Sequence, residues 1–311
     1  YPSALRIAAI YAVRELADAL ARLQAALQKR ERDFADIAKL GRTQLMDAAP
    51  VTLGGEFGAY AQAFARDRWR IYKVEERLRQ INLGGTAVGT GAAADRRYTF
   101  RVADVLRDLT GLGLARAEYP MDLTQNNDVF VEVSGLLKAC AVNLIKISGD
   151  LRLLASGPRG GLGEIALEPR QVGSSIMPGK VNPVIPECVA QCAMRVVAND
   201  AAITLAAASG QLELNAFMPL IADALLDSLA LLRNAADLFR AACIDTLQAD
   251  AAACARHLEA STAHALLLVP LLGYDAAAAL AKESLATGVP IRQLVLRKGL
   301  LPRETVQQLF R

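Results

Sequence analysis

Residues 16–27 read Leu-Ala-Asp-Ala-Leu-Ala-Arg-Leu-Gln-Ala-Ala-Leu, with leucines at positions 16, 20, 23 and 27. Spacings of four, three and four residues place these leucines on one face of an α-helix, which is predicted over roughly residues 3–38. Four more long helices are expected, over roughly residues 53–83, 122–155, 184–208 and 216–243. A shorter helix is expected over about 97–110, and Asp122 is the expected N-cap of the third long helix.

The composition agrees with a helical fold. Hydrophobic residues make up 53% of the 311 residues and aromatic residues only 5%, and Ala and Leu rank highest in helix propensity. No strand-like alternation stands out. After about residue 250 the expected helices become short, because glycines and prolines recur there. We therefore predict an all-α chain, with a long five-helix bundle over residues 1–250 and a small helical C-terminal domain over residues 251–311.

Charge and hydropathy exclude several kinds of partner. The net charge of +3 is too small to indicate a nucleic-acid-binding protein or one held on an anionic membrane. The most apolar stretch, residues 263–281, contains His264, Pro270 and Asp275, so it is not expected to span a membrane. The opening residues lack the basic region and the apolar run of a signal peptide.

The cysteines favour a reducing compartment. The chain has five cysteines and no CxxC pair. Cys188 and Cys192 are four residues apart and would share a helix face, but a metal site needs more ligands nearby. We therefore expect buried structural thiols and no metal site. Free thiols suit the cytoplasm, which is the predicted location.

The segment with the most chemistry is residues 173–183, which read GSSIMPGKVNP. Two adjacent hydroxyls, Ser174 and Ser175, lie in a loop with glycines, and Lys180 and Asn182 follow. Glycines allow successive backbone N–H groups to converge on an anion, and Lys180 adds a positive charge. The segment therefore predicts a carboxylate site with a hydroxyl beside it. The alternative is a polar turn in which Ser174 caps the next helix.

This run resembles the signature of the fumarase/aspartase superfamily, whose members eliminate a group from the carbon β to a carboxylate and release fumarate. The resemblance implies that Ser174 is the general base, that Ser175 contacts a substrate carboxylate, and that Lys180 and Asn182 hold a carboxylate. It extends over nearly the whole chain, through residues 85–91, 156–159 and 209–215. The opening resembles the residues that follow a substrate-binding segment, so the N-terminal domain of the family is expected to be missing from this chain.

A second segment helps to distinguish between the branches of the superfamily. Residues 41–54, GRTQLMDAAPVTLG, resemble the family motif in which GRT is followed by His or Gln. Fumarases have His directly after the Thr, whereas this chain has Gln44, so the resemblance favours aspartase. Residues 182–187 are also similar to aspartases. Met46 and Gly55 stand where the family usually has Gln, and Gly179 with residues 273–275 is closer to fumarase.

The resemblance implies a carbon–nitrogen lyase, an aspartate ammonia-lyase that reversibly removes ammonia from L-aspartate by anti-elimination. Thr43 and Gln44 would place the amino group. Glu187 would orient Gln44 or relay protons, or would only support the start of its helix. No metal or organic cofactor is implied. Two alternatives stay open: a class II fumarate hydratase, which is a carbon–oxygen lyase, and a catalytically inactive helical oligomerisation fragment.

The resemblance also implies a homotetramer that binds a small dicarboxylate in sites shared between subunits. Residues 201–208 are apolar nearly all round a helix, which predicts that this helix is buried on every side. Burial on every side would require neighbours from further chains.

Overall fold

The computed structural model describes residues 1–310, which fall into two compact units. The first unit comprises Tyr1–Ala26, Ala61–Arg152 and Pro169–Asp245. The second comprises Leu27–Tyr60, Leu153–Glu168 and the chain from Thr246 onward. The predicted domain boundary at residue 250 stays a prediction, because the second unit takes residues from both sides of it.

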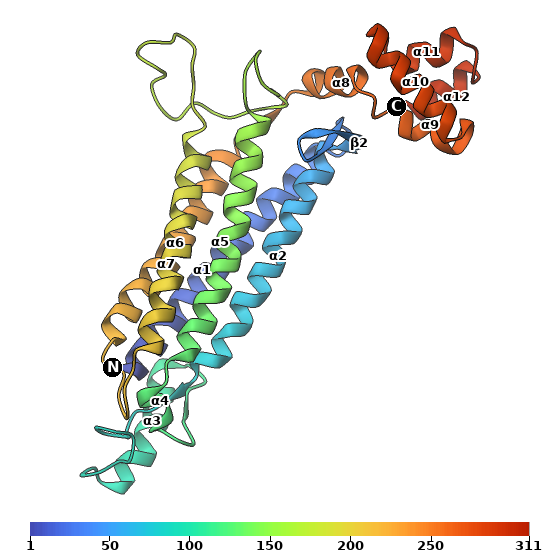
Figure 1. Cartoon of the computed structure of the whole chain (residues 1–311). Coiled ribbons are helices and arrows are strands. Elements are labelled where there is room, and N and C mark those ends of the chain that lie inside the picture. The colour runs from blue at the N-terminus through green and yellow to red at the C-terminus, as the bar shows by residue number, and fades with distance from the viewer. Residues whose placement is uncertain (311) are drawn as a thin grey trace. The chain divides into compact units, whose positions relative to one another are not determined.

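Five long helices supply the bundle of the first unit and lie side by side in Figure 1, which confirms the predicted all-α class. They are α1 (Pro2–Asp33), α2 (Leu53–Leu78), α5 (Asp128–Leu154), α6 (Val184–Ala208) and α7 (Met218–Phe239). The bounds of α6 coincide with the predicted ones. A π-helix, η1 (Arg240–Ile244), continues α7.

The apolar stripe on α1 is buried as its spacing predicts. Leu16, Leu20 and Leu23 have no exposed surface, and the same holds for Phe64 of α2 and Leu137 of α5. Burial of one such side chain stabilises the fold by about 1.5–3 kcal/mol. The leucine periodicity therefore identified the face of α1 that packs in the core.

Buried polar side chains join α6 to its neighbours. Asp200 of α6 accepts hydrogen bonds from Ser134 Oγ at 2.8 Å and Lys138 Nζ at 2.5 Å, both on α5. On the other side, Asn199 Nδ2 donates to Asp227 Oδ2 of α7 at 2.9 Å. Such directional contacts fix how far α6 lies along α5 and α7, because a shift of one turn would leave these buried groups unpaired.

The helix predicted to start at Asp122 is interrupted, so the prediction that Asp122 caps it is wrong. Asp122 instead begins a four-residue helix, α4 (Asp122–Gln125), and Asn126 after it is extended, with φ −96° and ψ 134°. Asn126 Nδ2 donates to Asp122 Oδ1 at 2.5 Å. The backbone N–H of Asn126 still donates to the carbonyl of Asp122 at 2.8 Å, so the turn closes there, and the extended backbone of Asn126 ends it before α5. The other short elements between α2 and α5 are α3 (Arg96–Thr110) and the parallel pair β3 (Gln80–Ile81) and β4 (Ala115–Arg116).

In the second unit, residues 38–52, where no strand was expected, form a β-hairpin. Strands β1 (Ala38–Thr43) and β2 (Met46–Thr52) pair antiparallel, with Thr43 opposite Met46. The register shifts between Leu40 and Arg42, and a bulge of this kind disturbs the alternation of buried and exposed residues. The strands were missed in the sequence because this alternation is lost.

The remainder of the second unit is helical, as predicted. A two-residue pair, β5 (Ile165–Ala166) with β6 (Gln248–Ala249), precedes the short helices. The helices are α8 (Ala251–Ala260), α9 (Ala265–Leu272), α10 (Tyr274–Thr287), α11 (Ile291–Arg297) and α12 (Arg303–Leu309). Their common core contains Leu268, Leu280, Ile291 and Val306, one from each of α9 to α12.

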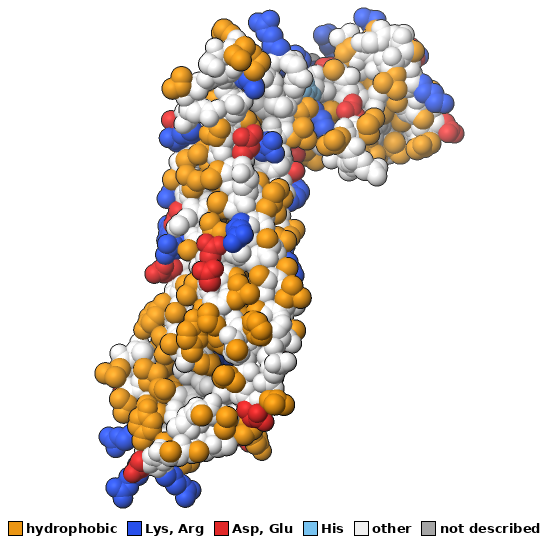
Figure 2. Space-filling view, turned by 60° about the vertical axis from the view of Figure 1, so that its left-hand side comes forward, with side chains coloured by type: hydrophobic (Ala, Val, Ile, Leu, Met, Phe, Trp, Pro, Cys, Tyr) orange, Lys and Arg blue, Asp and Glu red, His pale blue; other side chains and the backbone are white. Residues whose placement is uncertain are grey.

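The surface of the bundle carries many hydrophobic side chains (Figure 2). Residues 201–208, predicted to be buried on every side, are buried on one face only: Ile203 and Ala206 are buried, whereas Leu205 is 70% exposed. Among residues 1–310, no helix is both long enough and apolar enough to cross a membrane.

Candidate active site

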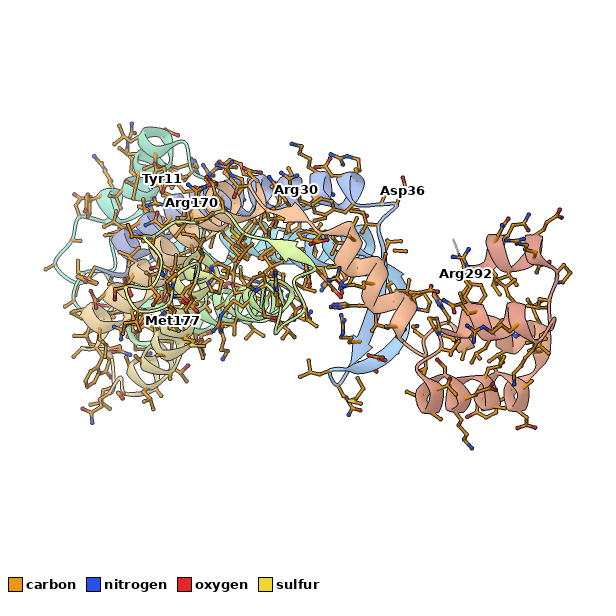
Figure 3. All side chains as sticks on the ribbon, turned by 90° about the horizontal axis from the view of Figure 1, so that it is seen from above. Tyr11, Arg30, Asp36, Arg170, Met177 and Arg292 are labelled. Carbon is orange, nitrogen blue, oxygen red and sulfur yellow. The ribbon has the colours of Figure 1, made fainter. Side chains whose placement is uncertain are left out.

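The loop that precedes α6 folds around the hydroxyl of Ser174. Its Oγ accepts hydrogen bonds from the backbone N–H of Ile176 at 3.2 Å and of Met177 at 3.0 Å. The backbone N–H of Ser174 donates to the carbonyl of Lys180 at 3.1 Å, and the N–H of Lys180 donates to the carbonyl of Met177 at 3.2 Å. Figure 3 labels Met177 in this loop. These bonds hold the half-buried hydroxyl in one position.

Two glycines permit this turn. A Cβ at Gly173 would lie 2.8 Å from the carbonyl oxygen of Lys180, closer than real Cβ contacts. Gly179 has φ +79°, a left-handed conformation that residues with a Cβ adopt at a cost. The alternative role of Ser174, as the cap of the next helix, is wrong, because the N-cap of α6 is Pro183.

The two N–H groups that donate to the Ser174 hydroxyl oxygen affect how easily this hydroxyl loses its proton. If Ser174 loses its proton, the same donors remain in place and their bonds become charge-assisted, which roughly doubles their strength. Hydrogen bonds to the charged form of a group favour that form. The loop therefore carries two fixed N–H donors that would stabilise an alkoxide at Ser174.

The other predicted residues of this segment belong to the same unit. Ser175 and Lys180 are exposed, and Asn182 is half-buried. Glu187 lies in the first turn of α6, where its Oε1 is 3.5 Å from Arg152 Nη2 of α5. An acid in the first turn also interacts favourably with the helix dipole. These contacts support the third of the predicted roles for Glu187, namely stabilising the start of the helix.

Thr43 and Gln44 belong to the second unit, at the tip of the hairpin. Gln44 and Leu45 are the two residues of the turn, and both have positive φ, +53° and +64°. A two-residue turn with positive φ at both positions is normally occupied by Asn or Gly, because a Cβ costs about 1–2 kcal/mol there. Backbone strain of this kind costs free energy and is often found at functional sites.

The sequence prediction missed a group of charged residues, the hairpin charge cluster, that supports this tip. Lys39 of β1 is 1% exposed, and its Nζ lies 2.8 Å from Glu56 and 2.9 Å from Glu164, whose side chain is fully buried. Arg42 binds the other oxygen of Glu164 at 2.9 Å, and His257 Nδ1 of α8 lies 3.2 Å from that oxygen. The one sequence signal for this cluster is that Arg42 belongs to the GRT motif and Lys39 lies three residues before it.

Opposing effects act on the pKa of Glu164. Burial raises this pKa, but the hydrogen bonds and positive charges of Lys39 and Arg42 outweigh burial and hold the pKa below its ordinary value. Glu164 is therefore a carboxylate, and it anchors both basic residues of the strand that ends at Thr43. The cluster thus fixes the base of the hairpin.

The thiols fall into two groups. Cys140, Cys243 and Cys254 are buried, as predicted, whereas Cys188 is exposed and Cys192 half-buried. The prediction of burial is wrong for the last two thiols. Within the described part of the chain, no group of three or more His, Cys, Asp or Glu side chains is placed to hold a metal ion.

Comparison with known proteins gives consistent matches. Residues 1–198 match the lyase family model, and residues 267–311 match the model of the fumarase C C-terminus. The aspartate ammonia-lyase of Bacillus subtilis (strain 168) is 41% identical over 304 residues, which are 98% of this chain and 64% of that protein. That of Pseudomonas aeruginosa is 44% identical over 311 residues, which are 100% of this chain and 66% of that protein.

Solved structures agree with the sequence matches. The crystal structure of fumarate lyase:delta crystallin from Brucella melitensis bound to cobalt has a TM-score of 0.96 and 43% sequence identity, covering 100% of this chain and 67% of that one. The class II fumarase from Schistosoma mansoni has a TM-score of 0.89 at 28% identity, covering 100% and 68%. The chain thus spans about two thirds of the length of its relatives. With a family model that matches 198 of its residues and homologues along its whole length, the chain belongs to the fumarase/aspartase superfamily of lyases.

Proposed function

We propose that the complete protein is an aspartate ammonia-lyase, which removes ammonia from L-aspartate and releases fumarate. The observation that carries this proposal is the Ser174 hydroxyl, held by two backbone N–H donors in the loop before α6. The similarity to aspartate ammonia-lyases from several bacteria, at 41–44% identity, supports this choice of substrate.

The proposed reaction needs a strong base. The proton on the carbon next to a carboxylate is weakly acidic, and its removal leaves a second negative charge on that carboxylate. Ser174 takes this proton as an alkoxide stabilised by the N–H groups of Ile176 and Met177. Lys180 and Asn182 hold the carboxylate on which the charge develops, and Ser175 contacts a substrate carboxylate.

Gln44 is the reason for proposing aspartate rather than malate. An amide does not take up a proton near neutral pH, as His does, so it is poorly suited to proton exchange with a leaving hydroxyl. Its carbonyl oxygen can still accept a hydrogen bond from an ammonium group. Thr43, beside it on the hairpin, would help to place that group. The strained turn would keep Gln44 in the required orientation.

The first experiment is an ultraviolet assay of fumarate formation by the complete gene product, with L-aspartate, L-malate and argininosuccinate supplied in parallel. We expect a signal from L-aspartate alone. A signal from malate alone would contradict the proposal and support a fumarate hydratase. A signal from none of the three would mean a different amino or hydroxy acid, or the inactive fragment.

A matched pair of variants tests the base. Ser174→Ala should lower kcat by about a hundredfold to ten-thousandfold, the typical cost of losing a general base, while the far-ultraviolet circular dichroism stays unchanged. The control is Ser209→Ala, because Ser209 is an exposed serine whose hydroxyl donates to the carbonyl of Leu205. Ser209→Ala should leave turnover within twofold. Near-normal turnover in Ser174→Ala would show that the base is another group.

We also propose that the protein is a homotetramer with sites shared between subunits. Exposed apolar side chains on three bundle helices support this: Val142 of α5, Met194 and Leu205 of α6, and Leu220 of α7. Thr43 and Ser174 would then act together from different chains. Mixing a Thr43→Ala variant with a Ser174→Ala variant should restore part of the activity, because some mixed sites contain both native residues. A monomer in light scattering would contradict this proposal.

We place the protein in the cytoplasm. All five cysteines are free thiols, and thiols persist in a reducing compartment. Fractionation of the native host with an antibody against the chain tests this location.

A further inference from the structure

One ring nitrogen of His257 lies between a hydrogen-bond donor and a hydrogen-bond acceptor. Its Nδ1 atom is 3.1 Å from Arg42 Nη2 and 3.2 Å from Glu164 Oε1. A guanidinium group only donates hydrogen bonds, and an ionised carboxylate only accepts them. Nδ1 therefore cannot satisfy both neighbours at once. Without a proton it accepts from Arg42, and with a proton it donates to Glu164.

The charges of the hairpin charge cluster balance while His257 is neutral. Two cations, Lys39 and Arg42, contact two carboxylates, Glu56 and Glu164, at 2.8 to 2.9 Å. A proton on His257 adds a further positive charge beside the Arg42 guanidinium. Like charges at this distance repel each other, and a buried charge without a partner costs free energy. Protonation of His257 therefore weakens its contact with Arg42.

Arg42 is the cation that is free to respond. The side chains of Lys39 and Glu164 are 1% and 0% exposed, whereas that of Arg42 is 15% exposed. Arg42 Nη1 also donates to the carbonyl of Leu40 at 3.3 Å, so this side chain keeps an acceptor when it leaves His257. The proton state of His257 therefore decides how Arg42 is held.

The neighbouring groups do not change charge in the range where a histidine does, which is about pH 5–8. Burial raises the pKa of Glu164, but its two basic partners outweigh burial and hold this pKa below its ordinary value. Burial raises the pKa of Cys254, one turn before His257 on α8, to about 11. The charged groups that face His257 from neighbouring elements are Lys39 and Arg42 of β1, Asp47 opposite Arg42 on β2, Glu56 of α2, and Glu164 before β5.

Arg42 connects this cluster to the tip of the hairpin. It directly precedes Thr43, and in the register of the strands Arg42 lies opposite Asp47 and Thr43 opposite Met46. The two turn residues between Thr43 and Met46 both have positive φ, so the tip is strained and depends on the strands to hold it. A weaker hold on Arg42 therefore reaches the strained turn within one residue pair.

We propose that His257 is a positioning residue whose proton state sets the order of the hairpin tip. Neutral His257 holds Arg42 through Nδ1, whereas protonated His257 bonds to Glu164 and repels Arg42. The hairpin is then more ordered at pH 8 than at pH 5.5. All of these contacts lie inside the second unit, so they do not depend on which surfaces other chains cover. Only the consequence for turnover rests on the proposed function.

The test is hydrogen–deuterium exchange of the complete protein, read by mass spectrometry on the peptides that cover residues 38–52. The matched variant is His257→Asn, because an Asn side chain offers an acceptor near the position of Nδ1 and takes up no proton. Comparing the two proteins at the same pH removes the chemical effect of pH on exchange. We expect equal rates at pH 8. At pH 5.5 the unaltered protein should exchange about ten- to a hundredfold faster, the range for losing one hydrogen bond to a charged group.

Turnover separates this proposal from the proposed function. If Gln44 places the amino group, kcat/KM for L-aspartate should fall more steeply between pH 8 and pH 5.5 in the unaltered protein than in His257→Asn. The exchange difference without any difference in turnover would support the role of His257 and contradict the role proposed for Gln44.

The control is His264→Leu, which replaces the other histidine of the chain and should leave the exchange response of residues 38–52 unchanged. A rate ratio that is the same at both pH values would overturn the proposal, and so would a response that disappears in His264→Leu. Crystal structures of the unaltered protein at the two pH values need no variant. Arg42 Nη2 should lie beyond hydrogen-bonding distance of His257 Nδ1 at pH 5.5, and an unchanged distance there would also overturn the proposal.

Discussion

Replacing Glu164 by Gln would remove one negative charge from the hairpin charge cluster and keep the size of the side chain. The carboxylate of Glu164 binds Lys39 through one oxygen and Arg42 through the other, at 2.9 Å each. A Gln amide offers one acceptor in place of two and turns an N–H group toward one of the two cations. Lys39 would keep Glu56, whose side chain is 28% exposed, as its remaining carboxylate.

The burial of Lys39 and Glu164 determines how much unfolding free energy the substitution should remove. The side chains of Lys39 and Glu164 are 1% and 0% exposed, so water cannot replace the lost charge. Removing one partner of a buried ion pair typically costs 3–5 kcal/mol, because the other charge is left uncompensated. We expect Glu164→Gln to destabilise the second unit by about this amount, which corresponds to roughly two to three and a half powers of ten in its unfolding constant.

Urea denaturation followed by hydrogen exchange of the β1 and β2 amides would measure this loss in the second unit. The matched control is Glu283→Gln in the same unit. Glu283 pairs with Lys298, but the two side chains are 35% and 45% exposed. Exposed pairs contribute about 0–1 kcal/mol, so the same chemical change should have little effect there. Equal costs at the two positions would refute the argument from burial.

Acidification gives an independent check. The pKa of Glu164 is lowered in the fold, so its stabilising contribution is present above the ordinary Glu pKa of about 4.3 and is lost as pH falls through the lower, folded value. The Glu164→Gln protein cannot lose this contribution. Its unfolding free energy should therefore fall less steeply below about pH 4.3 than that of the unaltered chain.

Three further substitutions have clear expectations. Gly173→Ala would place a Cβ 2.8 Å from the carbonyl oxygen of Lys180, and we expect kcat to fall about a hundredfold because the base is displaced; steady-state kinetics of the complete protein would measure this. Gly54→Ala would place a Cβ 2.4 Å from the backbone oxygen of Glu31, and urea denaturation should show a loss of about 1–3 kcal/mol. Burial lowers the pKa of His264. The contribution of neutral His264 to the unfolding free energy is therefore present above about pH 6.5 and is lost as pH falls through its pKa in the folded chain. His264→Leu should make the melting temperature less dependent on pH in that range.

Much of the fold could be predicted because it depends on local periodicity. The leucines of α1 and the bounds of α6 follow from helix spacing alone. The hairpin at residues 38–52 could not be predicted, because the shift between Leu40 and Arg42 disturbs its alternation. The break after α4 was missed because it is an extended conformation at the single residue Asn126. A change of backbone conformation at one residue leaves little trace in a periodic pattern.

The candidate site, like the fold, could be predicted only in part from the sequence. The glycines and serines of residues 173–183 predicted an anion-binding turn; the structure has a turn there, with two backbone N–H groups donating to Ser174 Oγ, and anion binding stays a prediction. The hairpin charge cluster joins residues as far apart in sequence as Arg42 and His257. Only the folded chain brings these residues together, so spacing along the sequence could not reveal the cluster. The roles of Thr43, Gln44 and Glu187 stay predictions.

The strained turn at Gln44 and Leu45 has a consequence for engineering the protein. Glycine at position 45 would relieve the cost of the positive φ there, so a selection for thermal tolerance would favour it. The same glycine would let the tip sample many orientations, and Gln44, in the role proposed for it, would spend less time in the orientation that binds the amino group. Variants that survive heating better through this position should turn over more slowly. The hairpin tip is thus a place where selection for stability of the chain and selection for the proposed role of Gln44 act in opposite directions.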